Sequence, residues 1–329
     1  MKVLIAVPTT EEAPATEYAE AIRGAWSAWN PDDSLTIVPL PHHGLGVAES
    51  ASGHLPEGHV LIDGAACLAQ ESLSGSTAPL ATPIADALAG GASRISVALC
   101  PLTVHDGGRG LLAALTERFG SVGQARTALG ETVLELVASS SLPLVGLGGA
   151  GAALASVVGA EEAQRRDLEV GEWAAGIERE HVRADLVEGR PLRHSTAPGS
   201  GLGGGAGFAL LVLGARYVHE APWVGEQAGI GRLVEEADLA IVVVPSLDAA
   251  AMDTSMLTVV GEAALEAAVP VAVISGEDQT SRRARAGLGI VGSSTTEGNT
   301  FSPGDVAQVV ARVARTWSPR NSQNRAAAT

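Results

Sequence analysis

The first candidate for a ligand-binding segment is a glycine-rich run at residues 198–207, with the sequence Pro-Gly-Ser-Gly-Leu-Gly-Gly-Gly-Ala-Gly. It leads into an apolar helix predicted over 208–217. Glycine permits positive φ and close approach to the backbone, and N–H groups at a helix start attract anions. The run therefore fits a substrate or nucleotide loop. Its candidate residues are Gly199, Gly201, Gly203, Gly204 and Gly205. Tight packing of the helix on a neighbour explains the glycines equally well. A dinucleotide site is disfavoured, because the polar stretch 190–197 is not a strand.

A second candidate follows a buried strand predicted over 95–99. Ligands of open α/β sheets bind outside the carboxyl ends of strands, and here the strand leads into the loop 100–108. In this loop His105 and Asp106 form a candidate acid–base pair. His105, Gly107 and Gly108 are also candidate residues of a substrate or nucleotide loop. The favoured alternative is that Asp106 caps a helix predicted over 109–119.

Two further loops carry candidate residues. Residues 42–46, His-His-Gly-Leu-Gly, form a predicted turn in which Gly44 and Gly46 are candidate ligand-binding positions. The paired histidines are possible metal ligands, but a zinc site needs further donors, so solvated histidines are favoured and no metal site is expected. In the loop 142–150, Gly148 and Gly149 leave room for close backbone contact.

Composition narrows the class of protein. The 329 residues have room for two domains, and the abundance of alanine, glycine and small aliphatics is typical of α/β proteins. The net charge of −16 argues against nucleic acid and anionic membranes as partners. Cys67 and Cys100 show neither metal-ligand spacing nor a disulfide framework. No apolar stretch approaches the ~20 residues of a membrane helix, and the first apolar run is too short for a signal peptide, so we expect a cytoplasmic protein.

Hydrophobic patterning places these loops between strands and helices. Strands over 2–7 and 35–40 flank a helix over 16–29, a βαβ start that predicts a right-handed crossover and a parallel sheet. Further strands are predicted over 60–63, 239–244, 269–275 and 289–291. Further helices are predicted over 82–88, 124–138, 161–190, 230–236, 257–268 and 303–317.

The order of the loops resembles that of the type 1 bacterial glycerate kinases over nearly the whole chain. Residues 198–207 match the family's Pro-Gly-Ala-Gly-Ala-Ala-Gly-Gly-Met-Gly signature position by position. Residues 91–108 align without gaps with its strand and Gly-Gly-Ser-Ala-Thr-Asn-Asp-Gly-Gly loop. Residues 143–150 are similar to its Asn-Pro-Leu-x-Gly-x-x-Gly-Ala motif, and 238–270 fit its strand, loop and helix. The combination is specific, although each motif alone is weak.

This resemblance implies a fold, a reaction and a site. The family pairs a flavodoxin-like parallel-sheet domain with a second α/β domain inserted in it, which here implies domains at 1–48 plus 207–329 and at 49–206. The family phosphorylates glycerate with ATP and Mg²⁺ in the cleft between the domains. Glycerate or a related hydroxy acid, with ATP, are therefore the implied small-molecule partners, and the oligomeric state is not indicated.

The chain departs from the family at the polar positions that phosphoryl transfer uses. Where the family has Asp-Gly-Gly-Glu-Gly-Thr, residues 42–47 read His-His-Gly-Leu-Gly-Val. The family's Asp-Ser-x-Lys becomes Thr-Thr-Glu-Glu at 9–12, and the lysine of its Pro-Gln-Lys-Gly-Ala becomes Val158. Its Thr-Gly-Glu-Gly-Arg-x-Asp keeps only the last residue, Asp248, and a downstream lysine becomes Ser255. In the loop 100–108, Pro101 removes an N–H that a phosphate cradle would use.

Asp106 and Asp248 are therefore the acids left as catalytic candidates. Phosphoryl transfer needs cations, a metal and a carboxylate that takes the substrate proton. A scaffold retained without these groups indicates a glycerate kinase family protein with weak, altered or lost phosphoryl transfer. The alternative is a pseudokinase that acts as a small-molecule-binding or regulatory protein. ATP and Mg²⁺ are expected as cofactors if the chain is active, and no cofactor otherwise.

Overall fold

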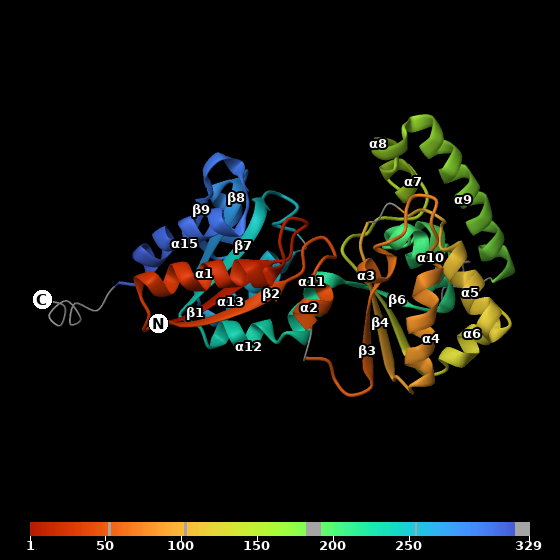
Figure 1. Ribbon diagram of the computed structural model, residues 1–329, viewed down its shortest axis with the longest axis horizontal. Helices are drawn as coiled ribbons and strands as arrows, with labels where there is room; N and C mark the ends of the chain where they lie inside the picture. Colours follow the sequence, from red (N-terminus) through yellow and green to blue (C-terminus); the bar gives the residue numbers. More distant parts are fainter. Residues whose placement is uncertain (52–53, 102–103, 182–191, 254, 320–329) are drawn as a thin grey trace, which may run out of the picture. The chain divides into compact units, whose positions relative to one another are not determined.

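The computed structural model describes residues 1–51, 54–101, 104–181, 192–253 and 255–319 (Figure 1). Contacts divide the chain into two units. Unit 1 consists of Met1–His54 and Ala221–Thr329, and unit 2 consists of Leu55–Glu220.

Unit 1 is built on a parallel sheet with the strand order β2-β1-β7-β8-β9. Its strands are β1 (Lys2–Pro8), β2 (Ser34–Leu40), β7 (Leu239–Leu247), β8 (Val271–Asp278) and β9 (Ile290–Thr295). Its helices are α1 (Ala15–Trp29), α2 (Val47–Ala51), α11 (Glu220–Gln227), α12 (Ile230–Glu235), α13 (Met256–Ala267), α14 (Arg282–Gly287) and α15 (Pro303–Trp317). Counted within the unit, this is the flavodoxin-like order 2-1-3-4-5, in which ligands bind where the order reverses, here between β1 and β7.

Both faces of this sheet are covered. On β1, Val3, Ile5 and Val7 pack in a cluster with residues of α1 and α15, while Leu4 and Ala6 on the opposite face are also buried. A strand that is buried on both faces has a continuous apolar sequence. The apolar sequences of β1 and β7 therefore predict these two strands well.

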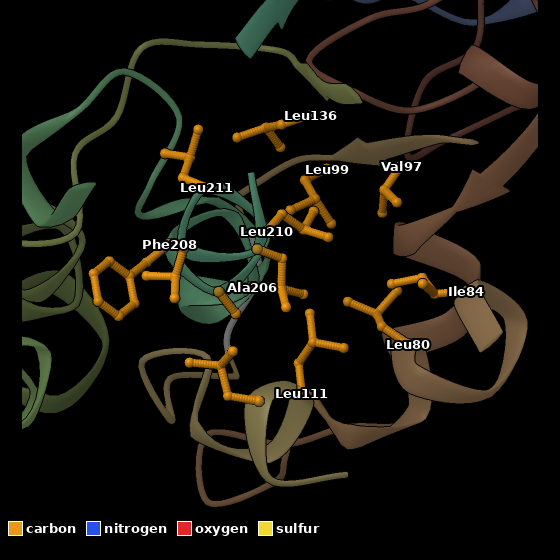
Figure 2. Packing of buried hydrophobic residues seen from close by; sticks show 14 of the residues in the cluster. Leu80, Ile84, Val97, Leu99, Leu111, Leu136, Ala206, Phe208, Leu210 and Leu211 are labelled. Atoms are coloured by element: carbon orange, nitrogen blue, oxygen red, sulfur yellow. The ribbon is translucent and has the colours of Figure 1, made fainter. Parts of the chain in front are cut away.

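Unit 2 has a parallel sheet with the order β3-β4-β5-β6. Its strands are β3 (His59–Asp63), β4 (Arg94–Leu99), β5 (Val133–Ala138) and β6 (Arg216–His219). Its helices are α3 (Gly64–Leu68), α4 (Ala81–Ala89), α5 (Arg109–Phe119), α6 (Val122–Leu129), α7 (Ala150–Ala153), α8 (Ala155–Val158), α9 (Ala160–Glu180) and α10 (Ala206–Leu213). Every residue of α10 is buried, and Figure 2 shows the helix surrounded by core side chains. A helix that is apolar all round belongs in a core.

Two predicted helices are wrong. The stretch 124–138 divides at Gly130, whose φ of 53° ends α6, and residues 133–138 form β5. The helix predicted over 208–217 ends at Gly214, which has φ 108°, and Arg216 begins β6. A left-handed glycine is a common helix end. α9 ends at Glu180, and residues 182–190 of its predicted range lie outside the described residues.

The unit boundaries differ from the expected 49–206. β6 pairs with β5, with Glu135 opposite Arg216, so α10 and β6 belong to unit 2. At the other boundary α2 contacts β2 and so belongs to unit 1. Among the described residues no helix is both long and apolar enough to cross a membrane.

Candidate functional site

Asp106 lies beyond the carboxyl end of β4, and its carboxylate is surrounded by donors. Oδ2 accepts hydrogen bonds from Thr77 N (2.8 Å), Gly110 N (3.0 Å) and Ser76 Oγ (3.3 Å). Oδ1 accepts from Gly108 N at 2.8 Å, and Thr77 Oγ1 lies 3.0 Å from both oxygens. The carboxylate thus caps the start of α5 and holds the turn at 76–80 against it.

The glycines at 203–205 bring two loops into backbone contact. Gly203 N donates to Cys100 O, and Gly107 N donates to Gly204 O, each at 2.9 Å. All three glycines have positive φ, and a Cβ on Gly205 would lie 2.4 Å from the Cα of Gly107. The space that these glycines leave free is therefore filled by the neighbouring loop of the same unit.

The earlier glycines of the run also contact protein atoms. Gly201 N donates to Leu142 O at 3.0 Å, and a Cβ there would lie 2.4 Å from Pro143 O. A Cβ on Gly199 would lie 2.9 Å from the Tyr217 ring, and the whole stretch 199–213 is buried. This geometry favours packing over ligand approach for the run.

The other candidate glycines have different surroundings. Gly108, at φ 88°, would place a Cβ 2.4 Å from Gly205 O. Gly149 is buried against the backbone of Val145, whereas a Cβ on the exposed Gly148 would meet nothing within 4 Å. The loop after β5 is thus open at Gly148.

His105 is buried, with 6% of its surface exposed. Among the described residues, no hydrogen-bond partner reaches its Nε2 atom. Burial lowers the pKa of His105, the nearby charge of Arg166 lowers it further, and Asp106 opposes both. The lowered pKa favours the neutral imidazole, and its Nε2 atom is enclosed by protein atoms.

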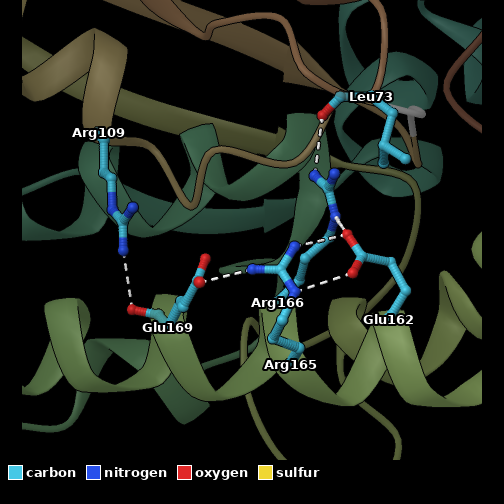
Figure 3. Close-up of polar contacts among 6 residues, drawn as sticks. All are labelled: Leu73, Arg109, Glu162, Arg165, Arg166 and Glu169. Atoms are coloured by element: carbon cyan, nitrogen blue, oxygen red, sulfur yellow. Dashed lines mark hydrogen bonds and ion pairs between the residues drawn. The ribbon is translucent and has the colours of Figure 1, made fainter.

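Helix α9 carries an ion-pair network beside this loop (Figure 3). Glu162 accepts from Arg165 Nη2 and from Arg166 Nε, each at 2.6 Å. Arg165 also reaches Glu169 at 2.6 Å. Arg109 of α5 donates to the backbone oxygen of Glu169 at 2.8 Å. The network orients the arginines and ties α9 to α5.

Asp167 is a candidate that the sequence reasoning missed. Its Oδ1 atom is buried with no partner among the described residues, and burial raises the pKa of the carboxyl. It faces Gly151, where a Cβ would lie 2.4 Å from Oδ1. The available signal was spacing: Ala163 and Val170 are buried on the same face of α9, and Asp167 falls between them at helical intervals.

In unit 1 the residues 42–45 form a tight turn after β2. His42 and Leu45 exchange two backbone hydrogen bonds of 3.0 Å, and His43 (φ 51°) and Gly44 (φ 88°) supply the left-handed positions. Such a turn has the geometry of type I′. Burial lowers the pKa of His42 to about 4, His43 acts in the same direction, and Asp248 opposes them.

Asp248, at the carboxyl end of β7, is held by its own loop. Its oxygens accept hydrogen bonds from Ala251 N at 2.9 Å and Ser246 Oγ at 3.0 Å. The Ala251 N–H is the main cause that holds the pKa of Asp248 below its usual value, and it outweighs burial. Ser255 caps α13 by accepting from Leu257 N.

Thr9, which directly follows β1, is also held by contacts with neighbouring residues of unit 1. Thr9 Oγ1 donates to Glu49 Oε2 at 2.9 Å, and a Cβ on Gly46 would lie 2.7 Å from Thr9 Cβ. In the described ranges, no three His, Cys, Asp or Glu residues gather as a metal site.

Comparisons with known proteins show the family of this chain and a structure of similar fold. A model of the glycerate kinase family matches residues 120–315. Two uncharacterized proteins, from Mycobacterium bovis and Mycobacterium tuberculosis, are 27% identical over 88% of this chain and 83% of their own length.

A crystal structure from Salmonella typhimurium LT2, provisionally assigned as glycerate kinase 2, superposes with a TM-score of 0.69 at 21% identity. The match covers 96% of this chain and 98% of that one, and it shows a shared fold. Because the family match spans more than half of the sequence, this chain belongs to the glycerate kinase family.

Proposed function

We propose that this chain binds glycerate or a related small hydroxy acid, and that its phosphoryl transfer from ATP is weak, altered or lost. The observation that carries the proposal is the surroundings of Asp106. A base that accepts a substrate proton needs a free lone pair, and the Asp106 carboxylate already accepts from five donor groups.

Asp248 supports the same conclusion. Each of its carboxylate oxygens accepts a local hydrogen bond, and its lowered pKa makes it a weaker base. Since the efficiency of proton transfer follows the strength of the base, a carboxylate held in this way is a poor catalyst near pH 7.

The donors of the loops do not fit a cradle for ATP and Mg²⁺. Mg²⁺ binds through one or two carboxylates together with substrate phosphates, and both aspartates are engaged elsewhere. The Gly107 and Gly203 N–H groups, which a phosphate would use, donate to protein carbonyls. These engaged donors and acceptors are therefore a poor fit for Mg²⁺ and ATP.

A second candidate function is a kinase with a relocated base. It is favoured by Asp167, whose Oδ1 has no partner in the described ranges and whose raised pKa suits proton acceptance. If this second function is correct, Asp167 takes the proton of the substrate hydroxyl, and D167N abolishes turnover.

Two measurements distinguish the proposed function from the second candidate. The first is a calorimetric titration of the full chain with D-glycerate, and the second is an ADP-release assay with ATP and Mg²⁺. The proposal predicts saturable glycerate binding without appreciable ADP release. Turnover at about 1–100 s⁻¹, the usual range for kinases, overturns it. The second candidate then requires that D167N, but not D106N, removes the activity from folded protein.

A further inference from the structure

Glu49 is a carboxylate of unit 1 that differs from Asp106 and Asp248, because only one of its oxygens is engaged by the described residues. It lies on α2, the short helix after the turn at 42–46 (Figure 1). Its Oε2 accepts a hydrogen bond from Thr9 Oγ1 at 2.9 Å. In the described ranges Oε1 accepts none, and it is not among the unpaired side-chain atoms that protein encloses. The half-buried carboxylate is therefore held at one oxygen and accessible to solution at the other.

The contacts of Thr9 place this carboxylate beside the point where the strand order of unit 1 reverses. Thr9 directly follows β1, whose neighbours in the sheet are β2 and β7. Thr9 N donates to Leu40 O at 3.1 Å, and a Cβ on Gly46 would lie 2.7 Å from Thr9 Oγ1. Ligands of such sheets bind outside the carboxyl ends of the strands at this point. Glu49 thus lies where the fold of unit 1 predicts a ligand.

The hydroxyl of Thr9 fixes the orientation of the carboxylate. A threonine hydroxyl has one proton to donate, and here the acceptor is Glu49. The same oxygen accepts from Ala15 N at 3.3 Å, at the start of α1. Because a strand end and a helix start hold Thr9, the Glu49 carboxylate is ordered before a ligand arrives, which lowers the entropy cost of binding.

The charge at this edge of the sheet decides which part of a hydroxy acid Glu49 can bind. A carboxylate only accepts hydrogen bonds, so it pairs with a hydroxyl and repels another carboxylate. Asp248 adds a second negative charge at the end of β7, and in the described part of the chain no Arg or Lys pairs with either acid. The terminal hydroxyl, which is farthest from the ligand's own carboxylate, is therefore the group that fits Oε1.

We propose that Glu49 determines specificity for the terminal hydroxyl of a small hydroxy acid, which donates a hydrogen bond to Oε1. Thr9 is the positioning residue that orients the carboxylate for this contact. The assignment rests on the proposed binding of a hydroxy acid, and it deepens that proposal by naming the hydroxyl that is recognised and the residue that recognises it.

The test is calorimetric titration of the intact chain with D-glycerate and with D-lactate, which lacks the terminal hydroxyl. Wild type should bind D-glycerate at least about tenfold more tightly, the usual value of a hydrogen bond to a charged group. E49M keeps the length of the side chain but removes the carboxylate, so it should bind the two acids within about twofold of each other. 3-Hydroxypropionate, which retains only the terminal hydroxyl, should also bind E49M at least about tenfold more weakly than wild type.

E12M is the matched control. Glu12 lies in the loop after β1 and is exposed, so E12M removes the same charge from the same region and should leave the preference for D-glycerate unchanged. T9V should reduce the preference severalfold, and T9S, which retains the hydroxyl, should restore it. A merely structural role of Thr9 would instead weaken the binding of D-glycerate and D-lactate alike.

The outcomes distinguish this assignment from the proposed function. If wild type binds neither acid, hydroxy-acid binding and the role of Glu49 both fail. If wild type binds D-glycerate and E49M retains the full preference over D-lactate, the role of Glu49 is wrong while hydroxy-acid binding stands. Should E49M not fold, E49Q provides the same test. Its neutral amide should reduce the preference about threefold or more, and an unchanged preference would overturn the assignment.

Discussion

Glu135 of β5 and Arg216 of β6 are register partners on parallel strands, and Arg216 Nε donates to Glu135 Oε1 at 3.0 Å. The same carboxylate accepts from Ser96 Oγ of β4 at 2.6 Å, and Ser96 in turn contacts His59 of β3 at 2.8 Å. One polar side chain from each strand thus joins a chain of contacts across the sheet of unit 2. It lies toward the amino ends of the strands, away from the loops that carry the candidate site.

Replacing Glu135 should destabilise unit 2. Glu135 is 1% exposed, so E135Q leaves a buried amide facing two arginines and is expected to cost about 1.5–3 kcal/mol of unfolding free energy. Urea denaturation at pH 7 measures the change. E117Q, on the exposed face of α5, is the control and should stay within about 0.5 kcal/mol.

The same pair predicts a pH dependence. Burial raises the pKa of Glu135, but Ser96, Arg216 and Arg94 outweigh it, so the pKa lies below its ordinary value. A lowered folded-state pKa gives stability that is present above the unfolded value of 4.5 and lost as pH falls through the folded value. The stability gap between wild type and E135Q should therefore shrink below pH 4.5. Parallel profiles would contradict the pairing.

Asp106 should behave as a structural residue. D106N replaces one acceptor oxygen by a donor that faces N–H and O–H groups, and about 2–3 kcal/mol of stability should be lost. D86N is the control, because Asp86 is 65% exposed and pairs with Arg118 at 3.6 Å, a contact of little value. If D106N were as stable as wild type, the structural role of Asp106 would be contradicted, and Asp106 would again be a candidate catalytic acid.

The glycine run should respond to substitution as packing residues do. In G205A the new methyl group would lie 2.4 Å from the Gly107 backbone at φ 98°, so we expect a loss of at least about 3 kcal/mol or failure to fold. G148A places its methyl group in open space and should be neutral. A stably folded G205A that lost only ligand binding would instead favour the ligand-loop interpretation.

Asp167 should affect the pH dependence of folding stability in the opposite direction to Glu135. Because burial raises its pKa, the protonated form favours folding below the ordinary value of 3.8, and this advantage is lost as pH rises through the folded pKa. D167N should therefore be more stable than wild type at pH 7, by up to about 1 kcal/mol, and equal to it in acid. Thermal unfolding at pH 7 and pH 3.5 compares them, and a destabilised D167N would contradict the unpaired Oδ1.

The sequence predicts the fold well where burial is continuous. The apolar runs of β1 and β7 and the βαβ start predict the parallel sheet of unit 1, which the structure confirms. The strand β5 was missed because α6 runs into it with only Gly130 and two polar residues between, so helical spacing extends across both. This interior strand of unit 2 thus depends on pairing with β4 and β6, which the local sequence pattern does not reveal.

The candidate site was harder to predict than the fold. The motif order located the loops, but the glycine run looks the same whether a ligand or another loop fills the space beside it. Contacts with Cys100 and Gly107, about a hundred residues away in sequence, decide that question. The unpaired atoms of His105 and Asp167 depend on burial by distant elements, which composition does not indicate.

The most direct test of the account is steady-state ADP release by the purified full chain with saturating ATP, Mg²⁺ and D-glycerate. The account predicts turnover at least a hundredfold below the usual kinase range of about 1–100 s⁻¹, in protein that still binds glycerate. Turnover within that range would contradict the claim that the retained aspartates are committed to structure.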